Sequence, residues 1–342
     1  MKVHESLWRN ESSSYIRLLP GAIGVSSRSC SLGLQRAVCD FGMESSFQQA
    51  GKRVEEHYGF SFPVSAVANI TRKHAQAIAA KQQARQGAHR LPVKGAETLV
   101  AEADGSFLRI VSTTQNKTDR RKTRQVEYRE ARLCAASAQG SDCIYYDATF
   151  KVVDTIAGLW SFTAKDAGMS THTHVHVVSD GAPWIYTQSK AAFGQQSCFL
   201  IDLYHVLEYL HEAAATCSKT PQRWLDTQKK RLKNGHSKKV IAELKKHIED
   251  DKLADADSPV RCALRYLKNR ADCLAYDVAL AQKLPLGSGL IESGNKHVLQ
   301  ARMKIPGASW SLDTAENFAR SRALRANGQW QDYWYNRNKH AA

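Results

Sequence analysis

A change of hydrophobic pattern near residue 97 does most to constrain what this 342-residue chain can fold into. Before that point apolar residues recur at helical spacing, and after it short β-branched segments alternate with amphipathic ones. The segments are strands at 98–113, 126–137 and 143–153, a helix at 157–168, a strand at 172–182, a helix at 182–195 and a strand at 198–204. Strands that alternate with helices in this way predict a mixed sheet covered by helices.

Three strands, helix, strand, helix and strand is the order of a ribonuclease-H-like sheet, and we predict an α/β fold of this kind. Beyond the last strand the pattern is helical and mostly polar, which predicts a large all-helical insertion. The predicted parts are a poorly ordered N-terminus at 1–30, a helical region at 31–86, a sheet domain formed by 97–206 and 284–305, a helical insertion domain at 207–283 and a C-terminal helical tail at 306–342.

The helical region at 31–86 has the pattern of three short helices. Gly59 fits a helix C-cap, and Pro63 fits an early position of the next helix. The third helix carries Arg72 and Lys73, and three helices of this kind are typical of a helix-turn-helix DNA-binding region. A helical clamp on the sheet domain fits the same pattern equally well, so both interpretations stay open.

The chain is basic, with 48 Lys and Arg against 33 Asp and Glu and a formal net charge of +15. This surplus favours polyanionic partners such as nucleic acid. No run approaches the ~20 apolar residues of a membrane span, and the N-terminus lacks the apolar segment of an export signal. We therefore predict a cytoplasmic protein with no membrane partner, whose eight scattered cysteines are reduced.

Basic residues are concentrated in the predicted insertion. Residues 219–250 contain ten Lys and Arg against four Asp and Glu, which favours contact with DNA phosphates over a merely solvated surface. Trp224 lies among them and fits two roles, stacking on an unpaired or flipped base and packing in the core of the insertion. The residues predicted to contact DNA are Arg72, Lys73, Arg120, Arg121, Lys122, Trp224, Lys229, Lys230, Arg231, Lys296 and Arg302.

Three acidic residues stand at the edges of predicted elements. Asp104 opens the first strand, Asp180 ends the fourth, and Glu292 lies near the start of a helix. Neighbouring carboxylates repel one another unless a divalent cation relieves the repulsion, and two such cations can activate an attacking hydroxyl and steady the leaving oxygen in phosphoryl transfer. Each Asp-Gly pair taken singly is more often a turn. Asp142 and Asp147 are alternatives for the first acid, although Asp147 sits in the middle of a predicted strand.

Three histidines alternate just before the second acid. On a strand, His172, His174 and His176 would share one face with Asp180, which is compatible with metal binding. Ordinary hydrogen-bonding roles beside a sheet are the favoured interpretation of these imidazoles.

Four segments of the chain resemble the DDE transposases of bacterial insertion sequences: DGSF, VVSDGAPWIY, FLIDLYHVLEYL and LPLGSGLIESGNKHVLQARMK followed by WS. The resemblance is to the ISKra-type group, related to the Mutator-like transposases, and it covers nearly the whole chain. It implies that Asp104, Asp180 and Glu292 hold two Mg²⁺ ions, for which Mn²⁺ can substitute. Asp202 and His205 match the D-x-x-H signature that follows the second acid, where they would support the site.

The resemblance also implies a function. Such an enzyme cuts DNA at the ends of an insertion sequence and transfers the freed 3′-hydroxyl into target DNA. Its partners would be double-stranded DNA, as transposon ends and as target, and further copies of the chain assembled on that DNA in the nucleoid. A stand-alone ribonuclease-H-like nuclease is one alternative, and a catalytically inactive DNA-binding remnant or regulator is another. Relatives usually carry paired cysteines in a longer N-terminal region, and no two cysteines here form a C-x-x-C pair.

Overall fold

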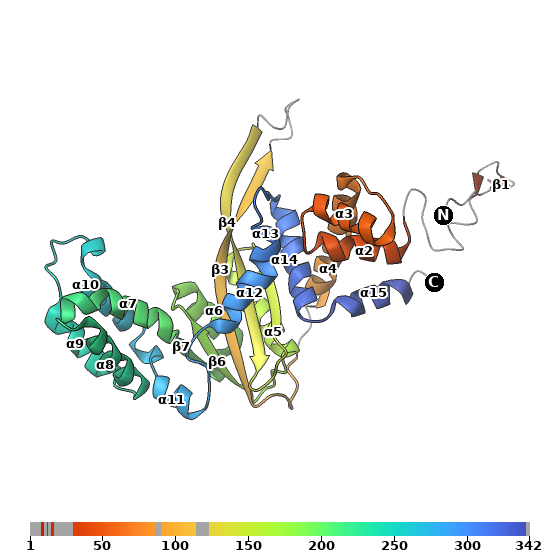
Figure 1. The fold of residues 1–342 in the computed structure, drawn as a ribbon. Helices are drawn as coiled ribbons and strands as arrows, with labels where there is room; N and C mark the ends of the chain where they lie inside the picture. Colours follow the sequence, from red (N-terminus) through yellow and green to blue (C-terminus); the bar gives the residue numbers. More distant parts are fainter. Residues whose placement is uncertain are drawn as a thin grey trace. The chain divides into compact units, whose positions relative to one another are not determined.

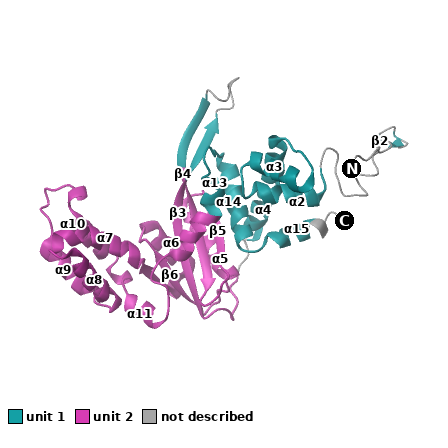
Figure 2. Ribbon diagram, viewed as in Figure 1, with its two compact units in different colours: residues 1–85, 108–128, 298–342 teal, residues 86–107, 129–297 magenta. Residues whose placement is uncertain are grey.

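The computed structural model of the chain describes residues 8–9, 12, 15–16, 30–85, 90–113 and 123–339 (Figure 1). The chain divides into two compact units: unit 1 contains residues 1–85, 108–128 and 298–342, and unit 2 contains residues 86–107 and 129–297 (Figure 2). The predicted tail thus belongs to the same unit as the N-terminal helices, and the predicted insertion to the same unit as the sheet. Most of the predicted N-terminus at 1–30, together with Arg120, Arg121 and Lys122, lies outside the described residues.

A five-stranded mixed sheet in the order β5-β4-β3-β6-β7 organises unit 2. β6 pairs in parallel with both β3 and β7, whereas β4 pairs with β5 in antiparallel fashion. The strands are β3 (Thr98–Thr113), β4 (Arg124–Ala138), β5 (Tyr145–Thr149), β6 (His174–Ser179) and β7 (Ser197–Ile201). All five lie where the alternating pattern predicts them, so the prediction of a mixed α/β fold is confirmed.

Helices cover both faces of this sheet. On one face lie α5 (Ile156–Asp166) and α6 (Pro183–Phe193), and Cys134 of β4 contacts Thr163 of α5, with 3.6 Å between Sγ and Oγ1. The neighbouring residue Leu133 points to the opposite face, because side chains alternate along a strand. There it meets α12 (Gly289–Gly294), so closely that a Cβ on Gly294 would lie 2.9 Å from the Leu133 side chain.

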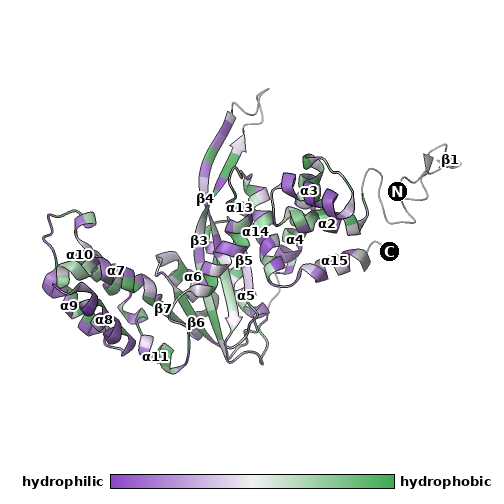
Figure 3. Ribbon diagram, viewed as in Figure 1, coloured by the Kyte–Doolittle hydropathy of each residue, from purple (hydrophilic) through white to green (hydrophobic). Residues whose placement is uncertain are grey.

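The predicted insertion is helical, as expected. Its helices are α7 (Leu203–Cys217), α8 (Pro221–Lys233), α9 (Ser237–Leu244), α10 (Pro259–Asn269) and α11 (Tyr276–Ala281). Figure 3 shows hydrophilic residues over much of α8 and α9, in contrast to the hydrophobic strands β6 and β7. The buried side chains of Leu232, Val240 and Val260 nevertheless belong to the same hydrophobic cluster as Val177 of β6. This shared core explains why the insertion is not a separate unit.

Unit 1 is built mainly of helices, and the three predicted near its start are present. Ser31 and Ser46 cap two of them, each side chain accepting a hydrogen bond from a backbone N–H three residues later. Gly59 closes the second in the left-handed conformation with φ of 69°, which confirms its predicted role as a C-cap. The helices of unit 1 are α2 (Leu32–Gly42), α3 (Phe47–Tyr58), α4 (Val64–Arg85), α13 (Ala301–Met303), α14 (Leu312–Ala326) and α15 (Trp330–Lys339).

The remaining elements are short. A pair of two-residue strands, β1 (Trp8–Arg9) and β2 (Tyr15–Ile16), is antiparallel. The 3₁₀ turns are η2 (Val153–Thr155), η3 (Gly194–Gln196), η4 (Lys245–His247), η5 (Asp255–Asp257) and η6 (Ala271–Cys273), and η7 (Asn295–Gln300) is a π-helical segment that follows α12. Among the helices described, none has the length and apolar character needed to cross a membrane.

Candidate active site

Asp104 and Asp180 are brought to the same level of the sheet by β3 and β6. These strands pair in parallel register from Thr98 opposite His174 to Glu102 opposite Val178. Two residues further on, β3 carries Asp104 and the chain leaving β6 carries Asp180. Burial raises the pKa of Asp104, and the negative charge of Asp180 raises it further. Two carboxylates therefore lie within electrostatic reach of each other at the point where β6 ends.

The prediction that Asp104 opens a strand is wrong. β3 runs continuously from Thr98 to Thr113, so Asp104 lies in its middle. The Asp-Gly pair favoured a turn, but Gly105 continues the strand, and a Cβ at this position would require the side chain of Glu130 to move. Asp104 nevertheless lies where the pairing of β3 with β6 stops, because β6 ends at Ser179 whereas β3 continues beyond that level.

The two carboxylates differ in how their oxygens are occupied. Asp180 Oδ1 accepts hydrogen bonds from Ser179 Oγ at 3.1 Å and from the backbone N–H of Ala182 at 3.0 Å. None of the described residues donates a hydrogen bond to Asp180 Oδ2. Asp104 Oδ1 accepts from its own neighbour Gly105 N at 2.7 Å, and its Oδ2 accepts from Asn295 Nδ2 at 2.6 Å. Asp180 therefore offers an oxygen that can bind a ligand, while Asp104 is held in orientation.

Two helices that follow β7 in the chain, α7 and α10, also reach this site. Tyr266 of α10 donates a hydrogen bond to the backbone carbonyl of Asp180 at 2.5 Å. His205 of α7 has a half-exposed side chain whose Nδ1 lies 3.1 Å from Glu208 Oε2, and a charge on His205 lowers the pKa of Asp104. His205 is thus close enough to act on the acidic pair electrostatically.

Two further residues of the site, Glu102 and Asn295, were missed by sequence reasoning. Glu102 is fully buried on the same face of β3 as Asp104, and its Oε2 accepts from Ile291 N of α12 at 2.8 Å. Burial raises the pKa of Glu102 to about 8, so this carboxyl is largely protonated at neutral pH. Asn295 follows α12 and binds Asp104. Alternation along β3 could have identified Glu102, since it stands two residues before Asp104.

Glu292, the third predicted acid, is carried by α12. Its side chain is exposed in the first turn of α12 and makes no hydrogen bond or ion pair with the described residues. Its charge does contribute to the raised pKa of Glu102, after the larger effect of burial. In the part of the chain that the structure describes, no three His, Cys, Asp or Glu side chains are arranged to hold a metal ion. The donor chemistry of Asp104 and Asp180 suits a hard cation such as Mg²⁺.

Asp202 ties the start of α12 to the sheet. It is almost fully buried and caps α7 by accepting from Tyr204 N at 2.6 Å. Its other oxygen, Oδ2, accepts from the backbone N–H of Ser288 at 2.7 Å and from Ser288 Oγ at 2.5 Å. Leu203 N also donates to the carbonyl of Leu286 at 2.8 Å. Asp202 thereby positions the segment from which the helix carrying Glu292 begins.

Asp202→Ala should lower the free energy of unfolding by about 2 kcal/mol, because it leaves the two buried donors of Ser288 and the backbone N–H of Tyr204 without their acceptor. Ser288→Ala removes one of the three hydrogen bonds and should cost about 1 kcal/mol. Urea unfolding followed by circular dichroism measures both. Equal stability of Asp202→Ala and the parent protein would contradict the anchoring role.

The alternating histidines make ordinary structural contacts. His176 is buried in β6 and its Nε2–H donates to the carbonyl of Pro285 at 2.9 Å, while burial lowers the pKa of its imidazole. His174 is half-buried and His172 is exposed before the strand begins. These contacts agree with the favoured interpretation.

The alternatives for the first acid are placed unfavourably. Asp142 is exposed in the turn between β4 and β5. Asp147 is buried in β5 opposite Cys134, whose side chain points to the face covered by α5. Asp104 instead faces α12, and β3 separates β4 from β6 in the sheet. Geometry therefore favours Asp104 as the partner of Asp180.

The basic residues predicted to contact DNA differ in exposure. Arg72, Lys73, Lys230 and Lys296 are exposed, and Lys229 and Arg231 are half-buried. Trp224 is only 8% exposed and belongs to the core cluster of unit 2, which favours the packing role for its indole. Arg302 is 2% exposed, a burial that the sequence pattern does not indicate.

Comparison with known families places the whole arrangement in context. The model of the Uncharacterised protein family (UPF0236) matches residues 5–338. The chain belongs to this family. The UPF0236 match spans both units, so the helices of unit 1, the sheet and its insertion are all family features. Among curated proteins, no match to the sequence was found.

Proposed function

We propose that this UPF0236 protein is a DDE-type transposase, which cuts DNA at the ends of an insertion sequence and joins the freed 3′-hydroxyl to target DNA. The observation that carries the proposal is the placement of Asp104 and Asp180 on neighbouring parallel strands where β6 ends. Such carboxylate pairs at a strand end are suited to divalent cations and phosphoryl transfer.

The sheet order supports a ribonuclease-H-like assignment. β3, the first strand of the sheet, lies at its centre, with β4 and β5 on one side and the parallel strands β6 and β7 on the other. The order of elements along the chain, three strands, helix, strand, helix and strand, supports the same assignment. The helical insertion lies between Asp180 and α12, where the resemblance to DDE transposases places it.

The side chains of the site have distinct roles in the proposed mechanism. Asp180 presents its free Oδ2, Asn295 fixes the orientation of Asp104, and Asp202 positions the start of the helix that carries Glu292. Bound divalent cations would neutralise charge on the scissile phosphate and stabilise the attacking and leaving oxygens. The protein then contributes position and charge rather than a covalent intermediate.

Metal-dependent cleavage and joining of a labelled duplex that carries the end of the element tests the proposal. Joining that requires Mg²⁺ or Mn²⁺ and stops with a chelator is the expected result. Cleavage without joining would indicate a stand-alone nuclease. Binding without cleavage under every metal condition would overturn the catalytic proposal and favour a DNA-binding protein.

The three consecutive basic residues Lys229, Lys230 and Arg231 of α8 are proposed to contact DNA phosphates. Reversing the charge of Lys229, Lys230 and Arg231 to Glu should weaken binding of any duplex, and the slope of log K against log salt should fall by about 2 to 3. A matched control exchanges Lys and Arg at the same three positions and keeps the charge. An unchanged slope in the reversed variant would mean that this face is merely solvated.

A further inference from the structure

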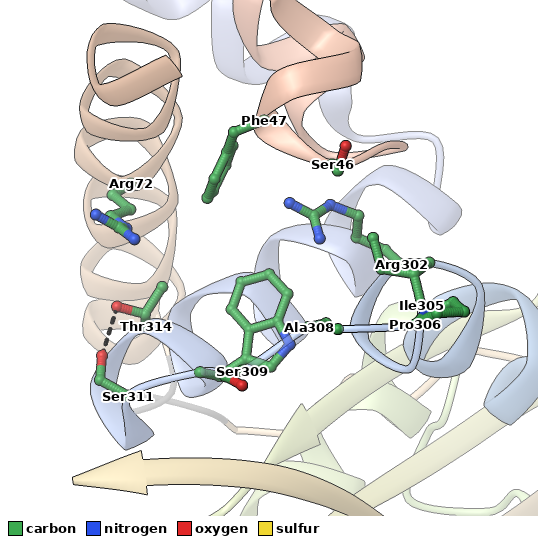
Figure 4. Close-up of a pocket in the computed structure, with 12 residues that line it drawn as sticks. Ser46, Phe47, Arg72, Arg302, Ile305, Pro306, Ala308, Ser309, Ser311 and Thr314 are labelled. Carbon is green, nitrogen blue, oxygen red and sulfur yellow. Dashed lines mark hydrogen bonds between the residues drawn. The ribbon is translucent and has the colours of Figure 1, made fainter. Parts of the chain in front are cut away.

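Unit 1 contains a pocket of about 240 Å³ between the start of α3, the middle of α4 and the segment that joins α13 to α14 (Figure 4). Two aromatic rings, Phe47 and Trp310, and two arginines, Arg72 and Arg302, line it, and none of its described lining residues is acidic. Its volume is somewhat below the ~300 Å³ at which pockets for drug-sized ligands begin. The pocket therefore suits one small, flat or anionic group.

Arg302 is the most unusual part of the lining. Its side chain is buried, and its Nε donates to the carbonyl of Gly42 at 3.0 Å. Its Cζ lies 5.0 Å from the centre of the Phe47 ring and 4.8 Å from that of Trp310. Figure 4 shows the guanidinium of Arg302 pointing toward Phe47. Its two terminal nitrogens have no hydrogen-bond acceptor among the described residues. A rigidly held fork of donors therefore remains available to a ligand.

The charge around Arg302 is incompletely compensated. Burial, and then the positive charge of the neighbouring Arg322, lower the pKa of Arg302 to about 10, while the distant carboxylate of Glu44 opposes this shift. Arg322 itself forms an ion pair with Glu44, with 3.4 Å between Nη1 and Oε2. An electron-rich ligand in the pocket would supply the acceptor that Arg302 lacks.

The mouth of the pocket adds a second cation and several hydroxyls. Arg72 is exposed, and its Cζ lies 5.5 Å from the centre of the same Phe47 ring. Ser311 Oγ donates to Thr314 Oγ1 at 2.8 Å. Ser309 also lines the pocket, and its Oγ accepts a hydrogen bond from Arg124 Nη2 at 2.9 Å. An exposed arginine such as Arg72 is suited to a phosphate, because its guanidinium supplies several hydrogen-bond donors.

We propose that this pocket binds one unpaired nucleotide of a DNA strand. The base lies against Phe47 and Trp310 with its acceptor edge on Arg302, and the phosphate lies at the mouth beside Arg72. Guanine is the preferred base, because its O6 and N7 accept two hydrogen bonds from one guanidinium. The inference concerns a different site from the acidic pair and does not depend on strand cleavage.

Fluorescence anisotropy of the full chain with a labelled nine-nucleotide strand, thymidine throughout except for one central guanine, tests the proposal without any metal. Ala308→Phe fills the pocket without altering an arginine, and it should weaken binding about tenfold, the size expected for loss of base stacking. Ala301→Phe, on the exposed surface of α13, is the matched control and should bind as the parent does. Binding of a blunt duplex should be the same in all three proteins.

Arg72→Gln is a second variant, chosen because its side chain is exposed and its loss should not disturb folding. It should weaken binding of the strand several-fold and leave the preference for guanine over an all-thymidine strand intact. Undiminished binding by Ala308→Phe, with its fold verified by circular dichroism, would overturn the proposal and leave Arg302 as a purely structural cation. Because no cleavage is measured, this outcome is independent of the proposed catalytic function.

Discussion

Asp180→Asn is expected to abolish strand cleavage while the fold and DNA binding persist. Asparagine has the shape of aspartate, and its carbonyl oxygen can still accept from Ser179 Oγ and Ala182 N. The change replaces the free Oδ2 by an amide NH₂, which cannot bind a cation. Loss of several kcal/mol of electrostatic stabilisation corresponds to a rate lower by roughly a thousandfold or more.

Time courses with a labelled duplex and Mg²⁺ measure this loss, and anisotropy with the same duplex measures binding. Asp142→Asn makes the same chemical change at an exposed position in the same unit, and it should cleave at the parental rate. Asp180→Asn also removes one negative charge beside Asp104, so its stability should be no lower than that of the parent protein. Retained cleavage by Asp180→Asn would remove Asp180 from the site.

The sheet was largely predictable, because alternation and β-branched residues determine strands locally. The segment predicted at 98–113 coincides with β3, and the polar helices after β7 are present as predicted. The register between β3 and β6 was not predictable in this way, since it depends on contacts between residues far apart in the chain. Hence Asp104 could be singled out as an acid, but its place level with Asp180 at the end of β6 could not.

Long-range contacts also explain why the role of Asn295 and the burial of Arg302 could not be predicted from the sequence. Asn295 meets Asp104 across 191 residues of sequence, and nothing local indicates which side of α12 faces the sheet. Arg302 looks like a surface cation in a basic segment. It is buried because Phe47, Trp310 and Phe318 surround its guanidinium, and Phe47 comes from a helix more than 250 residues earlier. The comparison with UPF0236 adds no residue roles, so those roles depend on geometry.

Unit 1 should lose stability in mild acid because of His74. Its imidazole is fully buried in α4, with Nδ1 2.7 Å from Tyr333 Oη and Nε2 2.9 Å from Gln35 Oε1. Burial lowers the pKa of His74 from 6.5 to about 4, and the nearby charges of Arg337 and Lys73 act in the same direction. The ring of Trp334 packs on it at 4.5 Å, so no counter-charge faces the imidazole from that side.

Proton uptake by His74 determines the direction in which the free energy of unfolding changes with pH. Between pH 6.5 and about 4 the unfolded chain binds a proton at His74 and the folded chain does not, so the free energy of unfolding falls as the pH falls. The contribution of His74 is fully present above pH 6.5, and about 3 kcal/mol is lost by pH 4. Urea unfolding at a series of pH values measures it.

His74→Gln should flatten this part of the profile, because an amide can hydrogen-bond to both partners of the imidazole without taking up a proton. His211→Gln changes an exposed histidine and is the matched control, for which the parental profile is expected. A profile of His74→Gln as steep as that of the parent protein would show that other groups cause the acid sensitivity. A flattened profile would mean that the packing of α15 against α4 depends on a neutral imidazole, since Tyr333 and Trp334 of α15 both contact His74.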